Sequence, residues 1–454
     1  MRAVYALPIL DKVLIYAPLH NLSALVNRAA AQSLASGLKG EREIHDHVKP
    51  LFDAVCVNGR AAPKRREGPL TNPHFLGLIP TRGCNMACLY CDFVVEENVA
   101  PTMQLPLVRQ ALDVYVDLLE RGESRLINVH FFGGEPLFAA EVVRFAVAYA
   151  RRLADSRAME TRFEVITNGV YKQDLARWIA DQFDTIVLSL DGPEEVQERQ
   201  RPSPSGLSVF PLIYRNARIF SEFARELILR VCVTHDTASQ LPEIAAWMAG
   251  EFRPTTVCFE TIHPTEQAIA AGLREPDPFE FAYQFHLAAQ ILEAAGINIV
   301  LSTADMSECH LSLCPVGKDA LIVSPEGDVD ACYLPEQVWR DAGLDMRLGR
   351  LNSKGLEIDL SNVERMRNLS VENKAGCASC LCRYHCAGGC HVRHNGRKEG
   401  DPYDAQCVQT RLVTVGNLLR RLKESELATR LLNSSPAMEE AVFQTSDLLL
   451  EQQA

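Results

Sequence analysis

Apolar and polar positions follow a regular pattern between about residues 75 and 302. Short runs rich in β-branched and aromatic residues predict six strands, at 74–81, 127–132, 163–169, 185–192, 227–234 and 255–262. Between them lie segments with apolar residues three to four positions apart, which predict helices, for example at 105–122 and 139–155. A further helix at 279–296 and a short strand at 297–302 end the region. Strands that alternate with helices are typical of an α/β fold with a parallel sheet, closed or partly closed.

The pattern changes on both sides of this region. The N-terminal residues predict a small α+β unit and a linker rich in proline and charge. Its expected elements are a strand at 12–19, helices at 22–38 and 42–55, and the linker at 61–73. Toward the other end, frequent cysteine and weak periodicity are typical of a loop-rich module held by metal, and an amphipathic helical tail follows. We therefore expect four units, at 1–74, 75–304, 305–415 and 416–454.

Composition and charge narrow the class of protein. Of the 454 residues, 47% are hydrophobic and 23% charged, which is ordinary for a globular protein. The formal net charge of −12 argues against a general nucleic-acid or anionic-membrane surface. Asp11 and Lys12 interrupt the apolar N-terminus, and no apolar run approaches the roughly 20 residues of a membrane span. We expect a cytoplasmic protein.

The chain has fifteen cysteines, an odd number, and eleven of them fall into three groups. In a reducing compartment, closely spaced cysteines bind metal more often than they form disulfides. The first group is C-x3-C-x2-C, formed by Cys84, Cys88 and Cys91. Three thiolates can hold three irons of a 4Fe–4S cluster and leave the fourth iron open to a small molecule. A zinc site with a distant fourth ligand, or cysteines packed as small apolar residues, would also fit this spacing.

The position of this group adds weight to the iron–sulfur interpretation. It directly follows the first predicted strand, and sites of parallel β/α folds lie where strands end. Polar signals follow the next strands at the same edge. They are Gly133, Gly134, Glu135 and Pro136 after the second strand, Thr167, Asn168 and Gly169 after the third, and Ser189 and Asp191 after the fourth.

The ordered set C-x3-C-x2-C with an aromatic before its last cysteine, then GGEP, then S-x-D-G, resembles the radical S-adenosylmethionine (SAM) enzymes over about residues 75 to 300. The resemblance implies a partial (β/α)6 barrel, a 4Fe–4S cluster on the three cysteines, and reductive cleavage of SAM to a 5′-deoxyadenosyl radical. Gly134 and Glu135 would meet the amino group of SAM, Ser189 its carboxylate or ribose, and the Tyr90 backbone its adenine. The SAM contacts that we expect are Tyr90, Gly133, Gly134, Glu135, Thr167, Asn168, Ser189, Asp191, Arg201 and Arg230. Asp191, Arg201 and Arg230 are the weaker members, because such residues at strand ends often form salt bridges.

The C-terminal cysteines are ordered as C-x12-G-x4-C, then C-x2-C-x5-C-x3-C, then a single cysteine. Zinc on C-x2-C pairs is the alternative, but the whole order resembles the SPASM domain, which binds two auxiliary 4Fe–4S clusters. The resemblance implies one cluster on Cys314, Cys332 and Cys390, with Cys309 as the fourth ligand, and another on Cys377, Cys380, Cys386 and Cys407. Without Cys309, one iron of the first auxiliary cluster would be open to substrate. Cys232 and Cys258 fit core strands, whereas Cys56 and Cys382 match no pattern.

Enzymes with this pair of domains modify peptides or proteins, and the resemblance implies a maturase. The favoured hypothesis is a crosslink, thioether or carbon–carbon, in a ribosomally made peptide. Oxidation of one side chain to formylglycine, as in anaerobic sulfatase maturases, is the second, although the Asp base of those enzymes is replaced here by Tyr333. A zinc or iron–sulfur protein without SAM chemistry is the third. Weak catalytic candidates are Glu260, His263 and Tyr333, and His130 is a further polar residue in a strand.

Two kinds of partner follow from the resemblance. One is a precursor peptide with a leader sequence, and the other is a one-electron donor such as flavodoxin or ferredoxin. The N-terminal unit would bind the leader if the strand at 12–19 offers an exposed edge for strand addition. A packing extension that covers the barrel is the equally favoured alternative.

Overall fold

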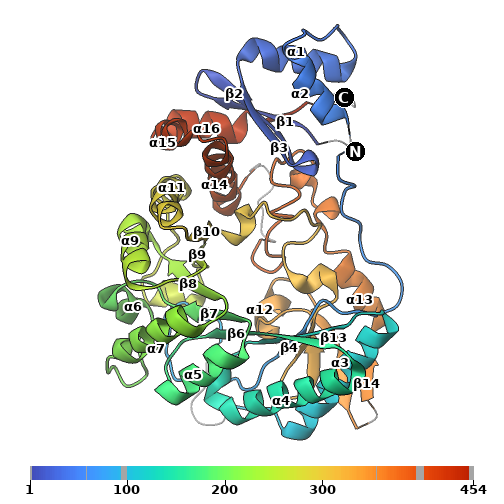
Figure 1. The fold of residues 1–454 in the computed structure, drawn as a ribbon, viewed down its shortest axis with the longest axis vertical. Helices are drawn as coiled ribbons and strands as arrows, with labels where there is room; N and C mark the ends of the chain where they lie inside the picture. Colours follow the sequence, from blue (N-terminus) through green and yellow to red (C-terminus); the bar gives the residue numbers. More distant parts are fainter. Residues whose placement is uncertain (1–2, 58, 94–99, 354, 395–402, 449–454) are drawn as a thin grey trace.

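The computed structural model describes residues 3–57, 59–93, 100–353, 355–394 and 403–448. Its centre is an 11-stranded sheet in the order β10-β9-β8-β7-β6-β5-β4-β11-β12-β13-β14. Seven parallel strands form one side of it (Figure 1). They are β4 (Leu76–Leu78), β5 (Leu126–Phe131), β6 (Glu160–Thr167), β7 (Thr185–Ser189), β8 (Leu227–Val233), β9 (Thr256–Thr261) and β10 (Asn298–Val300). All six predicted strands and the additional short one are present, so the α/β prediction is confirmed.

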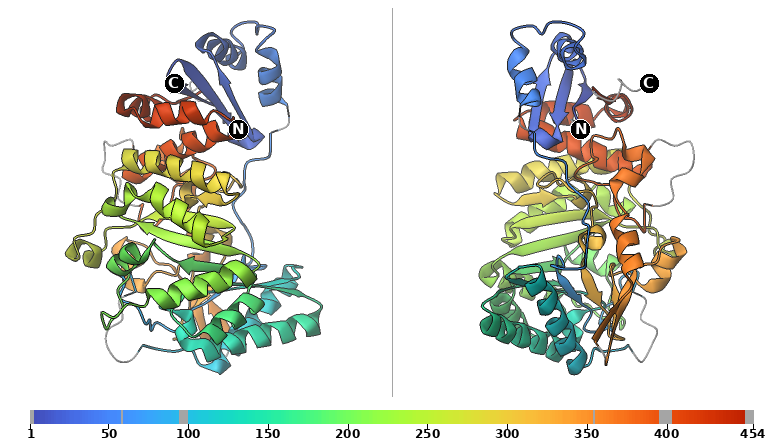
Figure 2. Two further views of the ribbon diagram at one scale, coloured as in Figure 1. Left: turned by 60° about the vertical axis from the view of Figure 1, so that its left-hand side comes forward. Right: turned by 90° about the vertical axis from the view of Figure 1, so that its right-hand side faces the viewer.

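Helices cover the outer face of the parallel strands, as Figures 1 and 2 show. The longer ones are α3 (Leu105–Arg121), α4 (Ala140–Arg157), α5 (Gln173–Gln182), α7 (Phe210–Phe223), α9 (Leu241–Glu251) and α11 (Pro278–Ala294). Short helices α6 (Glu194–Gln200), α8 (His235–Ala238) and α10 (Glu266–Ala270) lie in the connections. Along β6, Phe163 and Val165 are buried in the main core, whereas Arg162 and Glu164 alternate with them on the opposite face. That opposite face is polar and lines the lumen of the partial barrel.

The cysteine-rich region adds strands to the other side of the sheet. There β11 (Leu321–Val323) runs parallel to β4, and an antiparallel meander follows. The meander consists of β12 (Asp328–Asp330), β13 (Arg347–Asn352) and β14 (Gly355–Ile358), with helices α12 (Glu336–Asp341) and α13 (Leu360–Arg367) beside it. The sequence pattern did not predict these strands, because β11 and β12 have three residues each and show no measurable alternation. Gly327, at a φ of +86°, makes the turn between them.

A second sheet of four strands lies at one end of the molecule, in the order β15-β1-β2-β3 (Figure 2). Its strands are β1 (Tyr5–Ile9), β2 (Lys12–Ala17), β3 (Leu22–Val26) and β15 (Ser446–Asp447), and its helices are α1 (Arg28–Lys39) and α2 (Lys49–Cys56). Two expectations are corrected here. The segment 22–38 begins as strand β3 paired with β2, and its helix starts only at Arg28, after the Asn27 side chain caps Ala30 N. In addition β2 is paired on both sides, so the edge strands are β3 and β15.

The C-terminal segment returns to this second sheet. Helices α14 (Ala405–Arg421), α15 (Ser425–Leu432) and α16 (Ser435–Phe443) are followed by β15, which pairs with β1. The tail is therefore not helical throughout, and α14 crosses the expected boundary between 415 and 416. Buried side chains of β1, β2, α14, α15 and α16 share one apolar cluster, so the two ends of the chain pack together. Of the helices in the described residues, none is long and apolar enough to cross a bilayer.

Candidate functional site

The three N-terminal cysteines lie on one loop at the end of β4. The loop is anchored by backbone hydrogen bonds from Ala87 N to Pro202 O (2.8 Å) and from Leu89 N to Gln200 O (3.0 Å). Cys84, Cys88 and Cys91 are all partly exposed and in no disulfide. Burial raises the pKa of Cys84 to about 12, and the neighbouring thiols Cys88 and Cys91 contribute to that rise. The fold therefore gathers the three predicted thiols at the mouth of the barrel.

The GGEP segment packs directly against this loop. A side chain at Gly134 would place its Cβ 2.3 Å from Gly83 O, so only glycine allows this close approach. Glu135 is 1% exposed and accepts hydrogen bonds from Leu137 N, Thr167 Oγ1 and Asn168 N, at 3.0, 2.9 and 2.7 Å. Burial raises its pKa to about 7, although these hydrogen bonds oppose the rise. A buried carboxylate beside the cysteine loop is suited to meet a cationic amino group.

Asn168 connects the GGEP segment to the cysteine loop. Its Nδ2 lies 3.6 Å from Cys84 Sγ and donates to Asn85 Oδ1 at 2.8 Å. Thr167, which donates to Glu135, also contacts the Tyr171 hydroxyl at 3.4 Å. The structure thus brings the residues predicted after the first three strands into one place. The sequence did not single out Tyr171, because a lone tyrosine in a loop carries no pattern.

Asp191 and Arg201 form a buried ion pair behind the cysteine loop. Arg201 Nε and Nη2 donate to the Asp191 carboxylate at 3.0 and 3.1 Å, and the two residues are 7% and 0% exposed. The Tyr90 hydroxyl donates to the same carboxylate at 2.6 Å. Burial raises the pKa of Cys88, and Arg201 opposes this rise through its charge and a hydrogen bond. In this geometry Asp191 and Arg201 hold each other and the cysteine loop in place.

Ser189 and Arg230 are neighbours on the lumen face of β7 and β8, where they are register partners. Burial opposes the charge of the Arg230 guanidinium, but the nearby Cys258 and Glu260 outweigh it and raise its pKa. A guanidinium at this place can also meet an anionic ligand. The adjacent Ser189 hydroxyl is suited to the same anion.

Deeper in the lumen lies a polar group that the sequence predicted only in part. His130 Nδ1 is 3.6 Å from Glu164 Oε1, and the His130 ring stacks on Phe75 with centroids 4.1 Å apart. Burial raises the pKa of Glu164. The Tyr333 ring packs against Phe132 at 4.8 Å, and its buried hydroxyl has no hydrogen-bond partner among the described residues. Sequence analysis missed Glu164, although its alternation with Phe163 in β6 would have placed it on the lumen face.

The two remaining catalytic candidates differ in their surroundings. Glu260 accepts hydrogen bonds from Cys258 Sγ at 3.4 Å and from Ser302 N at 2.9 Å. One of its carboxylate oxygens is therefore already occupied as a hydrogen-bond acceptor. The pKa of His263 is lowered to about 4, first by burial and then by the charge of Arg393. A neutral imidazole at that position accepts a proton only in acid.

Seven of the C-terminal cysteines lie close to one another in two sets. Burial raises the pKa of Cys386, and the nearby thiols that add to it are Cys380, Cys407 and Cys377. Likewise burial raises the pKa of Cys332 to about 12, and the thiols that add to it are Cys314 and Cys390. The fold thus brings Cys377, Cys380 and Cys407 near Cys386, and Cys314 and Cys390 near Cys332.

Two further cysteines were not clearly assigned to these groups, and only Cys382 lies beside one of them, where its thiol shares a hydrogen bond with Cys380. The Cys309 thiol faces Pro18 O at 3.9 Å, beside the second sheet. Cys382 is 2% exposed, and its sulfur lies 3.6 Å from Thr414 Oγ1. Sequence reasoning also missed Arg411, whose buried guanidinium donates to Cys380 Sγ at 3.2 Å. Arg411 lies one helical turn after Cys407 in α14, and an arginine at that spacing forms no known motif.

Comparisons with known proteins agree with this geometry. The family model of the radical SAM superfamily matches residues 78–218. The chain is 26% identical over 397 residues to the mycofactocin maturase MftC of Mycolicibacterium smegmatis, covering 79% of this chain and 91% of that protein. It is 21% identical over 342 residues to a cysteine-type anaerobic sulfatase-maturating enzyme of Clostridium perfringens, covering 70% and 88%.

Two solved structures share the fold. One is anSMEcpe with bound AdoMet, with a TM-score of 0.60 and 17% identity, covering 78% of this chain and 99% of that one. The other is Streptococcus suis SuiB bound to precursor peptide SuiA, with a TM-score of 0.52 and 13% identity, covering 86% and 96%. The predicted fold class is confirmed by these likenesses.

Proposed function

We propose, from the premise that this chain is a radical SAM enzyme, that it installs a thioether or carbon–carbon crosslink in a ribosomally made peptide. The observation that carries the proposal is the second sheet, whose edge strand β3 is paired on one side only. All five residues of β3 are partly exposed, so its free backbone groups are available to an extended peptide. Strand addition of this kind is a common way to bind an extended peptide, and a leader sequence would bind in the same way.

The superfamily implies a 4Fe–4S cluster and SAM, and the residues of the barrel mouth fit both. Three thiols outside any disulfide, on one loop, match a cluster with an open iron. SAM bound to such a cluster supplies a 5′-deoxyadenosyl radical, which abstracts a hydrogen atom from an unactivated position. Glu135 would accept hydrogen bonds from the amino group of SAM, and Ser189 with Arg230 would hold its carboxylate. Asp191 and Arg201 would hold Tyr90 and Cys88 in place.

The C-terminal thiols support two auxiliary clusters. Cys386 and the three thiols near it would complete one cluster, and Cys332 with the two thiols near it would begin the other. Cys309 is the fourth ligand that the family resemblance implies, and its thiol would have to turn from Pro18 toward Cys314 to take that place. These clusters would accept the electron that a radical intermediate loses when it becomes a closed-shell product.

Tyr333 argues against aldehyde formation by the route of the sulfatase maturases, which use an aspartate base at this position. It follows the cysteine ligand Cys332, and its hydroxyl points over Gly77, where an added Cβ would lie 2.5 Å from it. Burial raises the pKa of Tyr333 well above its usual range, and the nearby Glu164 adds to the rise. A phenol held protonated in this way cannot take the proton that aldehyde formation must remove from a thiol or hydroxyl.

Oxidation of a single side chain is the second candidate function. The observation that favours it is Glu164, a lumen carboxylate close enough to Tyr333 to perturb it. With its pKa raised by burial, Glu164 would serve as a proton acceptor in place of an aspartate after Cys332.

The test is mass spectrometry of a short peptide encoded beside the gene, co-expressed anaerobically with the enzyme. A loss of two hydrogens, with fragmentation suppressed between two residues, is expected. A loss confined to one residue that reacts with hydrazine would replace the crosslink by an aldehyde. The Cys88→Ala variant, which should form no 5′-deoxyadenosine, is the control, and continued SAM cleavage in it would contradict the cluster assignment.

A further inference from the structure

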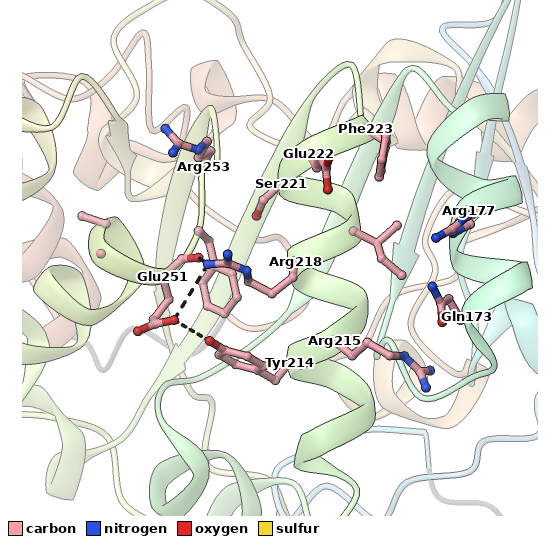
Figure 3. A pocket seen from close by; sticks show the side chains of 14 residues that line it. Gln173, Arg177, Tyr214, Arg215, Arg218, Ser221, Glu222, Phe223, Glu251 and Arg253 are labelled. Carbon is pink, nitrogen blue, oxygen red and sulfur yellow. Dashed lines mark hydrogen bonds and ion pairs between the residues drawn. The ribbon is translucent and has the colours of Figure 1, made fainter.

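A groove lies on the outer surface of the barrel, between α5, α7 and the end of α9 (Figure 3). Its cavity of about 920 Å³ is at the upper end of the volumes of small-molecule sites and is open to solvent. Its floor is apolar, formed by the buried Ile219 and Phe252, and the side chain of Phe223 at its rim is 55% exposed. An exposed aromatic over an apolar floor is typical of a surface that binds another protein.

The charge of the groove is opposite to that of the whole chain. Four arginines line it, whereas the acidic side chains in its lining are Glu222 and Glu251. Glu251 is already engaged, by the Tyr214 hydroxyl and by Arg218 at 4.0 Å (Figure 3). Arg177 and Arg253 are exposed, and within the described residues neither makes a recorded hydrogen bond or ion pair. On a chain of net charge −12, this positive groove favours an acidic partner.

The groove is connected to the cysteine loop through the loop after β6. Arg215, in the groove wall, donates to Tyr171 O at 2.9 Å. Two residues earlier in the sequence, Gly169 O accepts from Asn216 at 2.8 Å. On its other side the same loop holds the cysteine loop, because Asn85 Nδ2 donates to Val170 O at 2.8 Å.

The last link is Asn168, whose Nδ2 is 3.6 Å from Cys84 Sγ. Helix α5, which lines the groove, begins at Gln173, directly after the loop of residues 168–172. This short loop and its hydrogen bonds therefore connect the groove to Cys84, a thiol of the expected SAM-binding cluster.

We propose that this groove docks the acidic face of a reduced one-electron carrier protein, of the flavodoxin or ferredoxin class. The carrier would lose one electron, and a cluster held by Cys84, Cys88 and Cys91 would gain it. The inference rests on the proposed radical SAM function, which requires such an electron before SAM can be cleaved. Carboxylates of the carrier would pair with Arg177 and Arg253 at the rim.

The test compares two reductants in the full-length, cluster-loaded enzyme. 5′-Deoxyadenosine formation is measured with reduced flavodoxin at several concentrations, and separately with dithionite. For the double variant Arg177→Glu/Arg253→Glu, we expect kcat/KM for flavodoxin to fall about tenfold or more, since charge reversal acts on encounter. The rate with dithionite should not change. Arg177→Lys/Arg253→Lys should keep most of the flavodoxin rate, and Arg121→Glu, an exposed arginine at the end of α3, should behave as wild type.

The outcomes separate the docking site from the function. Equal flavodoxin rates in wild type and the double Glu variant would overturn the proposal, and so would a loss with both reductants. Weaker peptide modification under dithionite would also overturn it, because the groove would then bind the substrate. If wild type cleaves no SAM with dithionite, the proposed function fails, whatever the groove does. Raising the ionic strength should slow the flavodoxin reaction of wild type and leave its dithionite reaction unchanged.

Discussion

The ion pair behind the cysteine loop gives the sharpest test of the site. The Asp191 carboxylate accepts five hydrogen bonds, from Arg201 Nε and Nη2, Tyr90 Oη, Gln200 Nε2 and Cys232 N. Every one of these groups is a donor. Asp191→Asn conserves the shape but leaves one acceptor oxygen and turns an NH₂ group toward donors. The buried Arg201 guanidinium then has no counter-charge.

The expected cost follows from burial. Removing one partner of a buried ion pair typically costs about 3–5 kcal/mol, because the remaining charge is left without compensation. We therefore expect Asp191→Asn to lower the free energy of unfolding by about that amount. Glu120→Gln, which removes the partner of Arg157 on the exposed surface of α3, is the matched control and should cost about 1 kcal/mol or less.

The assay is urea denaturation of both variants under anaerobic conditions, followed by tryptophan fluorescence. SAM cleavage with dithionite is measured beside it, because Tyr90 and Cys88 lose their support together. A loss of stability in Asp191→Asn no greater than that of Glu120→Gln would refute the reasoning. It would mean that the five donors find water or other acceptors, and that the loop does not depend on Asp191.

Three further variants test other parts of the site. Cys380→Ala should lower the iron content by about one cluster, whereas Cys382→Ala should leave iron analysis unchanged; equal losses would contradict the ligand set. Because the pKa of Glu135 is about 7 in the folded protein and near 4.5 when unfolded, it contributes stability below pH 4.5 that is lost as pH rises through 7. In urea denaturation without SAM, the free energy of unfolding of Glu135→Gln should therefore rise relative to that of wild type by up to about 3 kcal/mol between pH 4.5 and 7.5. A difference between the two proteins that does not change with pH would disprove the raised pKa of Glu135. Gly134→Ala should cost about 1–3 kcal/mol and weaken SAM binding by calorimetry, because its Cβ would meet Gly83 O; wild-type affinity would show that the loops can separate.

Local patterns in the sequence determined the barrel and the cysteine groups. Strands such as β6 and β8 are recognisable because their side chains are buried by the fold at every second position. The spacing of Cys84, Cys88 and Cys91 indicates a cluster because ligands close in sequence are close in space. The segment 22–26, in contrast, was expected to be helical, because its pairing with β2 is a tertiary contact that local propensity does not report.

Only the tertiary structure decided what residues distant in sequence do together. It pairs β15 with β1, and it places Arg411 against Cys380, which lies 31 residues earlier. It also turns Arg201 toward Asp191, and it brings Arg177 of α5 and Arg253, from the segment after α9, to one groove. The physical reason is that a sequence encodes periodicity and spacing locally. Ion pairs, sheet edges and grooves depend instead on which surfaces pack, and packing is settled by the whole chain.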